Sequence, residues 1–352
     1  MGVIFLDARD FLKESESSAI LDVRSPVEYA QGHIPGALNL PLFSDEERAE
    51  VGICYKNKGF LKAFLLGLRF VGPKLPHMVE KAWELSGQSK KIYLYCARGG
   101  QRSQSVAWLF AKSGLEVFVL KGGYKFFRRF VLELLEKKRK LLILGGLTGS
   151  GKTELLHQLA SRGWPVLDLE GLANHRGSAF GHLGLPPQPT VMQFENNLAL
   201  ALVKLPEDEP IFVEDESRMI GRLPIPKALW EEMRRSPVFF LRVDRETRIK
   251  NILAQYGASK AQELVVAFKQ IEKRLGQELT QKCISLVEQG LYAEAARLSL
   301  HYYDRAYLYG LSKRDPQSII YVDGNLAREN LSLFEFKLRE EIKKLQTMEV
   351  VS

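Results

Sequence analysis

A cysteine followed by a short, positively charged turn is the first place in this sequence where chemistry is expected. Residues 91–95 form an apolar run typical of a buried strand, and Cys96 comes directly after it. Backbone N–H groups in such a turn point into one hollow, beside the positive end of the following helix. These surroundings stabilise a thiolate and hold an anion at the sulfur. We therefore predict that Cys96 is catalytic and that its anion cradle consists of Arg98, Gly99, Gly100, Gln101 and Arg102.

The second candidate is a glycine-rich loop over residues 145–153. It follows the apolar run 141–144 and reads Gly-Gly-Leu-Thr-Gly-Ser-Gly-Lys-Thr, which is a complete Walker A pattern. The glycines let backbone N–H groups surround phosphate oxygens, the lysine supplies counter-charge, and the threonine hydroxyl can ligate Mg²⁺. The predicted phosphate-binding residues are Gly146, Thr148, Gly149, Ser150, Gly151, Lys152 and Thr153.

Charged residues after later strands are candidate partners of this loop. The apolar run 211–213 ends at Glu214 and Asp215, either of which can hold Mg²⁺ through water, although an ordinary acidic loop is the alternative. His175 and Arg176 lie in a loop over residues 172–181 that fits an anion contact or a plain turn. Arg242, Arg245 and Arg248, after a later strand, fit a phosphate clamp or surface ion pairs. The spacing of His and Cys indicates no firm metal site.

The positive charge of the chain is concentrated in its first part. Residues 1–140 contain 23 Lys and Arg against 15 Asp and Glu, whereas the remainder is balanced. Eight of the basic residues fall within residues 121–140, together with two glutamates. Such a stretch is a candidate site for a phosphate backbone, and a solvated helix face is the alternative.

The composition is that of an ordinary globular protein, with 45% hydrophobic and 26% charged residues. Its three cysteines do not form a disulfide framework. No apolar run approaches the ~20 residues that span a bilayer, and residues 1–10 lack the features of a secretory signal. We expect a cytoplasmic protein with no membrane contact and no tightly bound cofactor.

Two series of apolar runs and helical patterns predict two α/β domains with parallel sheets. The first domain covers residues 1–135, with strands at 3–6, 19–23, 37–40, 92–95 and 117–120 and a mostly helical insertion at about 45–87. An amphipathic helix and linker follow at 124–138. The second domain covers residues 136–352, with strands at 141–144, 165–167, 211–213, 238–243 and 319–322 and a largely helical region at 246–312.

Segments of the first domain resemble the signatures of rhodanese-family sulfurtransferases. Residues 22–41 are similar to the first signature and residues 120–124 to the closing one. In that family the cysteine accepts a sulfur atom, so the resemblance gives Cys96 a carrier role and assigns structural roles to Asp22, Arg24 and Glu28. Five residues separate Cys96 from Arg102, one more than in simple rhodaneses. This longer loop resembles that of rhodanese-fold phosphatases and can fit a tetrahedral phosphate group.

A rhodanese-like domain joined to a P-loop domain is similar to the tRNA 2-selenouridine synthases. Residues 50–56, 96–102, 146–153, 175–181 and 213–218 all resemble that family. The resemblance implies a transferase that geranylates the wobble 2-thiouridine of tRNA with geranyl diphosphate. It then replaces sulfur with selenium from selenophosphate, and Cys96 carries or delivers the selenium. Cys54 is left without a role, and the P-loop would bind geranyl diphosphate or ATP.

The same resemblance implies partners for the chain. These are tRNA, contacted through its anticodon stem-loop, and an enzyme that supplies selenophosphate. The basic stretch then provides the candidate tRNA-binding residues Arg128, Arg129, Lys137 and Lys138.

Two other functions stay open at this point. A rhodanese-fold phosphatase with a nucleotide-binding regulatory domain is favoured by the length of the Cys96 loop. A non-catalytic adaptor that binds tRNA or a nucleotide would leave Cys96 unreactive.

Overall fold

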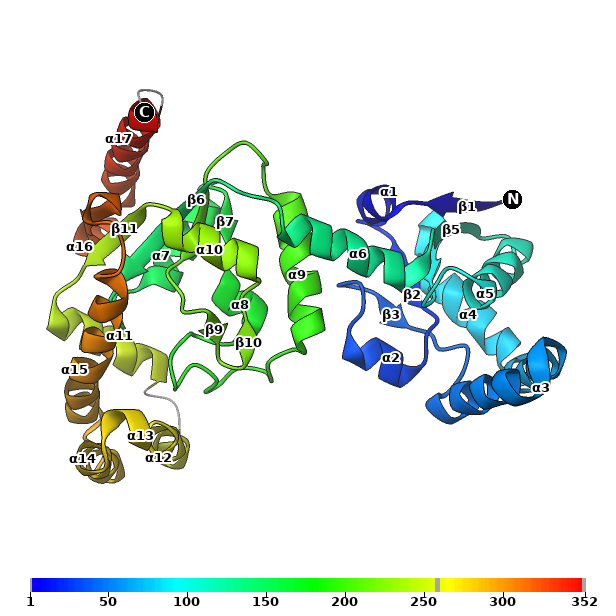
Figure 1. Cartoon of the computed structure of the whole chain (residues 1–352), viewed down its shortest axis with the longest axis horizontal. Coiled ribbons are helices and arrows are strands. Elements are labelled where there is room, and N and C mark those ends of the chain that lie inside the picture. Colours follow the sequence, from blue (N-terminus) through cyan, green and yellow to red (C-terminus); the bar gives the residue numbers. More distant parts are fainter. Residues whose placement is uncertain (1, 257–259, 350–352) are drawn as a thin grey trace. The chain divides into compact units, whose positions relative to one another are not determined.

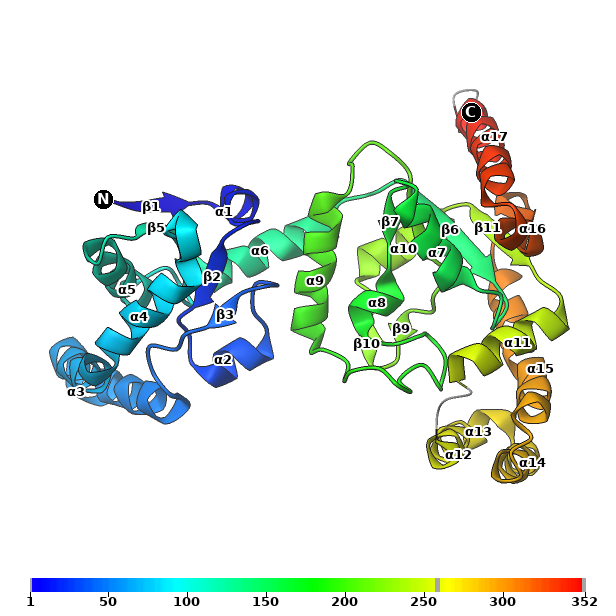
Figure 2. The ribbon, with the colours of Figure 1, turned by 180° about the vertical axis from the view of Figure 1, so that it is seen from behind.

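The computed structural model describes residues 2–256 and 260–349, and the chain forms two compact units (Figures 1 and 2). Unit 1 consists of Met1–Glu136 together with Thr190–Leu200, and unit 2 consists of Lys137–Pro189 and Ala201–Ser352. The first break lies one residue beyond the predicted end of the first domain. The sequence did not indicate that residues 190–200 belong to unit 1.

Unit 1 is built on a five-stranded parallel sheet in the order β1-β5-β4-β2-β3. Each strand matches a predicted one within a residue or two. Because all strands run the same way, the carboxyl ends of β2 and β4 meet at one edge, where Val23 N donates to Tyr95 O at 3.0 Å. The strands are β1 (Val3–Leu6), β2 (Ala19–Asp22), β3 (Leu38–Asn39), β4 (Lys91–Tyr95) and β5 (Glu116–Leu120).

Helices pack on this sheet and form the predicted insertion. The insertion consists of α3 and α4, and α3 departs from helical geometry at Gly59, where φ is 80°. Ser44 and Glu47 cap the start of α3 reciprocally, which fixes where the helix begins. The helices are α1 (Ala8–Glu14), α2 (Pro26–Gln31), α3 (Asp45–Val71), α4 (Leu75–Ser86), α5 (Gln101–Lys112) and α6 (Gly123–Leu135), with 3₁₀ turns η1 (Gly72–Lys74) and η2 (Gly87–Ser89).

Residues 190–200 are held in unit 1 by polar contacts. They include most of helix α9 (Val191–Lys204), in which Asn196 is fully buried. Its Nδ2 donates to Tyr124 Oη at 2.7 Å and to the His33 carbonyl at 2.9 Å, and its Oδ1 accepts from Arg128. Thr190 Oγ1 donates to the Gln31 carbonyl at 2.7 Å. These bonds need partners far away in the sequence, so hydrophobic periodicity does not reveal them.

Unit 2 has a second five-stranded parallel sheet, in the order β12-β11-β6-β8-β7. All five predicted strands are present. A short antiparallel pair, β9 (Met219–Ile220) with β10 (Leu223–Pro224), was not predicted. The parallel strands are β6 (Leu141–Gly146), β7 (Val166–Leu167), β8 (Ile211–Glu214), β11 (Val238–Arg242) and β12 (Ile319–Asp323).

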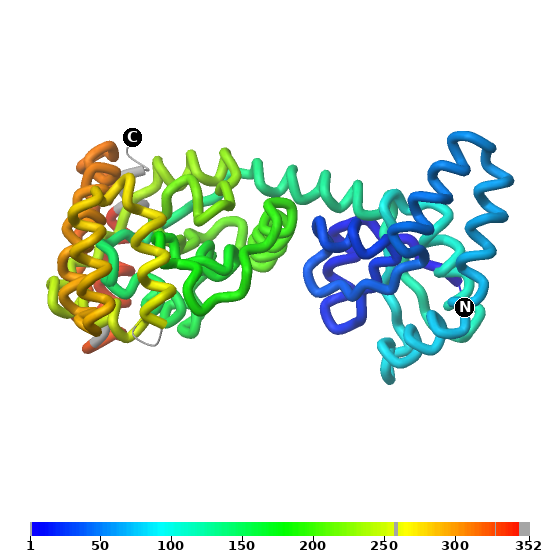
Figure 3. Tube along the Cα trace, turned by 90° about the horizontal axis from the view of Figure 1, so that it is seen from below, coloured from blue at the N-terminus to red at the C-terminus, as the bar shows by residue number. Residues whose placement is uncertain are grey.

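The helices of unit 2 form two groups. One group packs on the sheet. Helices α7 (Lys152–Ser161), α16 (Gly324–Glu329) and α17 (Leu331–Glu349) share a core with Leu144 and Phe212. Helices α8 (Leu169–Ala173) and α10 (Lys227–Arg235) contact β8 and β6, respectively. The other forms the predicted helical region, seen in yellow and orange in Figure 3: α11 (Arg245–Tyr256), α12 (Ala261–Gln270), α13 (Glu272–Leu275), α14 (Gln277–Glu288) and α15 (Tyr292–Leu311), followed by η3 (Pro316–Ser318). No helix within residues 2–256 and 260–349 has both the length and the apolar character needed to cross a bilayer.

The buried Asn196 gives a test of how α9 is held. Asn196→Leu should lower the free energy of unfolding of unit 1 by about 2–4 kcal/mol, because the His33 carbonyl, Tyr124 and Arg128 all lose a buried partner. Calorimetry of the full chain measures this change. Asn197→Ala is the matched control, since Asn197 bonds only with Gln193 of the same helix turn among the contacts described, and a shift of the same size there would contradict the assignment.

Candidate functional site

Cys96 lies at the carboxyl end of the middle strand of unit 1, below the first turn of α5. Its side chain is 2% exposed, and its Sγ is 3.2 Å from Ser103 Oγ. Ser103 in turn donates to the Gly100 carbonyl at 3.1 Å. The sulfur therefore has a hydroxyl neighbour at the start of a helix, although the rest of its side chain belongs to the apolar core.

The turn after Cys96 is held by the start of α6. Tyr124 N donates to the Cys96 carbonyl at 2.8 Å, and Lys125 N donates to the Ala97 carbonyl at 3.0 Å. This close approach requires glycine. Gly123 has a φ of 60°, and a Cβ placed there would lie 2.3 Å from the Cys96 carbonyl oxygen. The closing signature at residues 120–124 therefore fixes the backbone of the cysteine turn.

The two arginines of the turn have different surroundings. Arg102 pairs with Glu28 at 2.9 Å, and Glu28 also pairs with Arg48 at 3.1 Å. Burial alone would raise the pKa of Glu28, but the hydrogen bond and charge of Arg102, helped by Arg48, lower it. Glu28 thus orients Arg102, a role that the signature resemblance did not reveal. Arg98 is exposed.

Asp22 and Arg24, the other residues to which the first signature gave a structural role, lie close to the turn. Asp22 and Arg24 form a buried ion pair at 2.6 Å. The Arg24 guanidinium lies 3.8 Å from the centre of the Tyr124 ring and donates to the Gly32 carbonyl. The structural role assigned to this pair agrees with these contacts.

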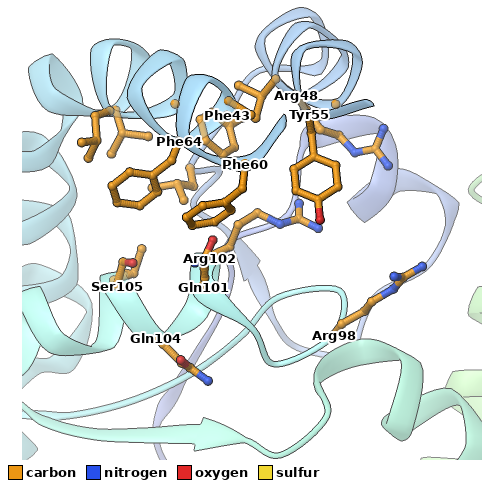
Figure 4. Close-up of a pocket in the computed structure, with 18 of the residues that line it drawn as sticks. Phe43, Arg48, Tyr55, Phe60, Phe64, Arg98, Gln101, Arg102, Gln104 and Ser105 are labelled. Atoms are coloured by element: carbon orange, nitrogen blue, oxygen red, sulfur yellow. The ribbon is translucent and has the colours of Figure 1, made fainter. Parts of the chain in front are cut away.

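A cavity of about 1250 Å³ opens beside the cysteine turn, between α3 and α5. Arg98, Gln101 and Arg102 of the predicted cradle lie on its wall, whereas Gly99 packs on the start of α6. Residues of α3, among them Tyr55, Phe60 and Phe64, line most of the rest (Figure 4). The sequence did not predict this cavity, because its two walls are more than 30 residues apart in the chain.

The phosphate loop of unit 2 has the expected form, and α7 begins at Lys152. Gly149 and Gly151 adopt φ values of 81° and 82°. Lys152 Nζ donates to the Gly146 carbonyl at 2.9 Å, and the Ser150 hydroxyl is buried without a partner. The loop therefore brings together its lysine, a buried hydroxyl without a partner and the start of a helix, and a lysine and a helix start are features of phosphate-binding loops.

Residues of α11 hold this loop from the side. Asn251 Nδ2 donates to the Gly149 carbonyl at 2.6 Å, and Arg248 donates to the Thr148 carbonyl at 3.3 Å. Arg248 is also in a two-bond ion pair with Asp304, with both distances 2.7 Å. Arg248 is therefore placed at the phosphate loop.

The carboxylate in contact with Thr153 is Glu170, not Glu214 or Asp215. Thr153 Oγ1 donates to Glu170 Oε2 at 2.8 Å. Asp215 accepts from Tyr307 and Arg314, both at 2.7 Å, and so supports the base of the loop. Glu170 follows a two-residue strand, and no motif in the sequence marks it.

Buried carboxyl groups gather next to Glu170. Glu214 is fully buried and accepts from Leu169 N, and burial, with the charges of Asp168 and Glu170, raises its pKa well above the usual range. Burial and the charge of Glu170 also raise the pKa of Glu216 well above its usual range, against the opposing effect of Lys152.

The loop at residues 175–181 packs against Glu216. A Cβ on Gly177, where φ is 63°, would lie 2.5 Å from the Glu216 carboxylate. His175 is buried with its Nδ1 unpaired, and burial and the charge of His182 lower its pKa. Arg176 donates to the Leu183 carbonyl at 2.8 Å. The structure thus places this loop against the acidic cluster, and its predicted anion contact stays a prediction.

Hard oxygen ligands are available at the phosphate loop. No group of three or more His, Cys, Asp or Glu side chains suited to a metal ion occurs in the part of the chain that the structure describes. Mg²⁺ does not need one, because it usually takes one or two protein oxygens together with phosphates and water. Thr153 and Glu170 fit this requirement.

The four basic residues predicted to bind tRNA differ in how exposed their side chains are and in their ion pairs. Arg128 is largely covered by its ion pair with Glu195 and its bond to Asn196. Arg129 and Lys137 are exposed and have only surface ion pairs, with Glu133 and Glu207. Lys138 is exposed. Arg128 therefore helps to hold α9, and the other three stay at the surface.

Comparisons with known proteins match both units. Residues 7–129 match the rhodanese-like domain, and residues 139–331 match the tRNA 2-selenouridine synthase AAA domain. The chain is 40% identical over 336 residues to the tRNA 2-selenouridine synthase of Marinobacter nauticus, covering 86% of this chain and 90% of that protein. It is 38% identical over 335 residues to that of Sulfurovum sp., covering 89% and 91%.

A solved structure matches part of the chain. It is the N-terminal domain of a putative ATP/GTP binding protein from Clostridium difficile 630. Its sequence is 39% identical, it covers 37% of this chain and 99% of its own, and the TM-score is 0.35.

The close approach at Gly123 gives a test of the cysteine turn. Gly123→Ala should destabilise unit 1 by at least about 2 kcal/mol, because a positive φ and an overlap with the Cys96 carbonyl add together. It should also expose the Cys96 thiol to iodoacetamide, which peptide mass spectrometry measures. Gly36→Ala is the control, since Gly36 has a φ of 83° but no atom near its Cβ position. Equal effects at both positions would contradict the proposed contact.

The raised pKa of Glu216 predicts a pH-dependent site. Its carboxyl group holds a proton where an ordinary glutamate has lost it, and a bound cation must displace that proton. Binding of pyrophosphate with Mg²⁺ should therefore tighten as the pH rises through the raised pKa of Glu216. Calorimetry in buffers of different ionisation enthalpy measures the proton release. Glu216→Gln should flatten the dependence, whereas Glu209→Gln on the surface should not. An unchanged pH profile in Glu216→Gln would rule out this role.

Proposed function

This chain belongs to the tRNA 2-selenouridine synthase family, and from that membership we propose that it converts the wobble 2-thiouridine of tRNA into 2-selenouridine. It is an enzyme of tRNA modification. The similarity to named family members over most of both chains carries the proposal. The cysteine turn and the phosphate loop support it, because each offers an anion site at a helix start.

The first proposed step is geranylation of the thiouridine sulfur. The sulfur attacks C1 of geranyl diphosphate, the C1–O bond breaks, and diphosphate leaves. The backbone N–H groups of the phosphate loop and Lys152 would hold that diphosphate, and Mg²⁺ on Thr153 and Glu170 would neutralise part of its charge. This alkylation converts a poor leaving group into one that departs as a thiol.

An apolar pocket beside the phosphate loop supports the choice of a prenyl diphosphate over ATP. Thr148 of the loop is on its wall, and the other lining residues are mostly aromatic and aliphatic. They include Phe180, Tyr256, Phe268 and Tyr303. The pocket is small, about 70 Å³, so it would take only part of an isoprenoid chain whose diphosphate lies in the loop. Geranylation itself requires no ATP hydrolysis.

The second proposed step takes place at the cysteine turn. Selenophosphate is a tetrahedral anion, and the turn supplies Arg102, oriented by Glu28, next to the exposed Arg98. Cys96 would carry the selenium or deliver it to C2 of the alkylated uridine. Ser103, whose hydroxyl is 3.2 Å from the sulfur, would exchange a proton with the thiol. An enzyme that makes selenophosphate is the expected supplier.

The proposed tRNA contact uses the exposed basic residues. Arg129, Lys137 and Lys138 would bind backbone phosphates of the anticodon stem-loop, and such contacts weaken as the salt concentration rises. Arg128 has a smaller part in this contact, because its guanidinium is already paired with Glu195.

Two variants separate the proposed steps, and each is the control for the other. In tRNA from cells that express only the variant, Cys96→Ser should abolish selenouridine and leave geranylthiouridine. Lys152→Ala should lower both nucleosides by at least about tenfold, since the loop lysine is the main counter-charge for the diphosphate. Nucleoside mass spectrometry measures both products. Selenouridine in the Cys96→Ser strain, or normal geranylthiouridine in the Lys152→Ala strain, would remove that residue from its step.

A further inference from the structure

The cavity beside the cysteine turn is much larger than selenophosphate requires. Its apolar wall comes from the part of α3 after Gly59 and from α5. Phe60, Phe64, Leu68 and Trp108 line it, and these large apolar side chains are 41–61% exposed. Apolar groups gathered in an open groove generally mark a binding site.

Positive charge is concentrated at one end of this groove. Arg48, Arg98 and Arg102 line it with Tyr55, whereas Phe60 and Phe64 extend from α3 toward α5 (Figure 4). Glu28 pairs with Arg48 and Arg102, and its single negative charge offsets one of the three positive charges. The groove therefore combines a long apolar wall with a cationic end at the turn that carries Cys96.

We propose that this groove binds the geranyl chain of S-geranyl-2-thiouridine in tRNA while selenium displaces the sulfur. The inference rests on the proposed function, and it gives the alkylated nucleotide a binding site in unit 1. The chain lies along Phe60, Phe64 and Trp108. The cationic end receives the sulfur that departs and the nearby RNA phosphate.

The occupant is the chain on the nucleotide rather than free geranyl diphosphate for two reasons. The phosphate loop of unit 2 already provides the N–H groups, lysine and apolar pocket that a diphosphate needs. In addition, Arg98, Gln101 and Arg102 of the turn that follows Cys96 line the groove. At the proposed selenation step the geranyl chain is attached to the uridine sulfur.

The displacement balances without an oxidant or a reductant. Selenium of selenophosphate, which Cys96 delivers from its turn, forms a bond to C2 of the uridine, and the C2–S bond breaks with its electron pair on sulfur. The sulfur takes a proton and leaves as geranylthiol. Water then cleaves the Se–P bond, giving 2-selenouridine and inorganic phosphate. Arg98 and Arg102 stabilise the departing thiolate until it is protonated.

The experiment compares two alkylated RNAs with the full-length protein. Anticodon stem-loop RNA that contains either S-geranyl- or S-methyl-2-thiouridine is mixed with selenophosphate, and selenouridine is measured by mass spectrometry. The wild type should prefer the geranyl RNA in kcat/KM by at least roughly tenfold, because it buries many more methylene groups. The double variant Phe60→Gln with Phe64→Gln should lower this preference to within about twofold, mainly through KM.

The same helix provides a matched control. Leu61 and Leu65 are 65% and 49% exposed on α3 but do not line the groove. The double variant Leu61→Gln with Leu65→Gln should keep the full preference. Since all four side chains are exposed, both variants are expected to fold, and circular dichroism with the rate on S-methyl RNA checks this.

Other outcomes are distinguishable. An unchanged preference in the Phe60 and Phe64 variant would overturn the groove assignment and leave the proposed function standing. If that variant instead lost geranylation of thiouridine RNA by geranyl diphosphate, the groove would bind the free diphosphate, and the inference would be wrong. If the wild type selenated thiouridine RNA directly and never formed the geranyl intermediate, the alkylation step of the proposed function would fail.

Discussion

Both candidate sites depend on one constraint: backbone N–H groups have to converge on an anion at the point where a parallel strand passes into a helix. Only residues that tolerate positive φ and close backbone approach allow this convergence. In unit 1, Gly99 and Gly123 let the cysteine turn approach the start of α6 closely. Backbone N–H groups of α6 donate there to the Cys96 and Ala97 carbonyls at 2.8 and 3.0 Å. In unit 2, Gly149 and Gly151 curl the phosphate loop before α7. The two parallel sheets hold these turns in place.

The surrounding side chains orient the charges that these turns require. Glu28 holds Arg102, and the Tyr307–Asp215–Arg314 network supports the base of the phosphate loop. Their distances are those of strong, charge-assisted bonds, and their partners come from other elements of the same unit. The acidic group at Glu170 and Glu216 is different, because its members repel one another and the pKa of Glu216 is raised. A cluster of this kind is stable only with protons or a cation, and it stands beside Thr153, the residue that a Mg²⁺ ion at the phosphates would use.

What could be predicted from the sequence follows from how local each feature is. The strands, the cysteine turn and the phosphate loop are contiguous in the chain, so apolar runs and glycine spacing were enough to find them. Glu170 and Glu28 were not recognised as site residues, because each becomes one only through a partner 17 or 74 residues away. The return of residues 190–200 to unit 1 depends on buried hydrogen bonds of Asn196, and the α3–α5 groove depends on packing. Arg128, predicted from charge alone, has a partner in α9 that no count of basic residues reveals.

An apolar cavity lies beside the cysteine turn and another beside the phosphate loop. The proposed two-step chemistry would need both, because a geranyl chain takes part in each step. A single anion site can hold a tetrahedral phosphate, but it cannot distinguish an alkylated sulfur from an unmodified one. An apolar wall can, because each buried methylene group adds about 0.8 kcal/mol to binding. If selenium were delivered before alkylation, the sulfur of thiouridine would be a poor leaving group and substitution would be slow. Water would then hydrolyse the selenium donor. If the groove binds only the alkylated nucleotide, selenation at the cysteine turn would have to follow geranylation at the phosphate loop. Selective binding would then determine the order of the two steps.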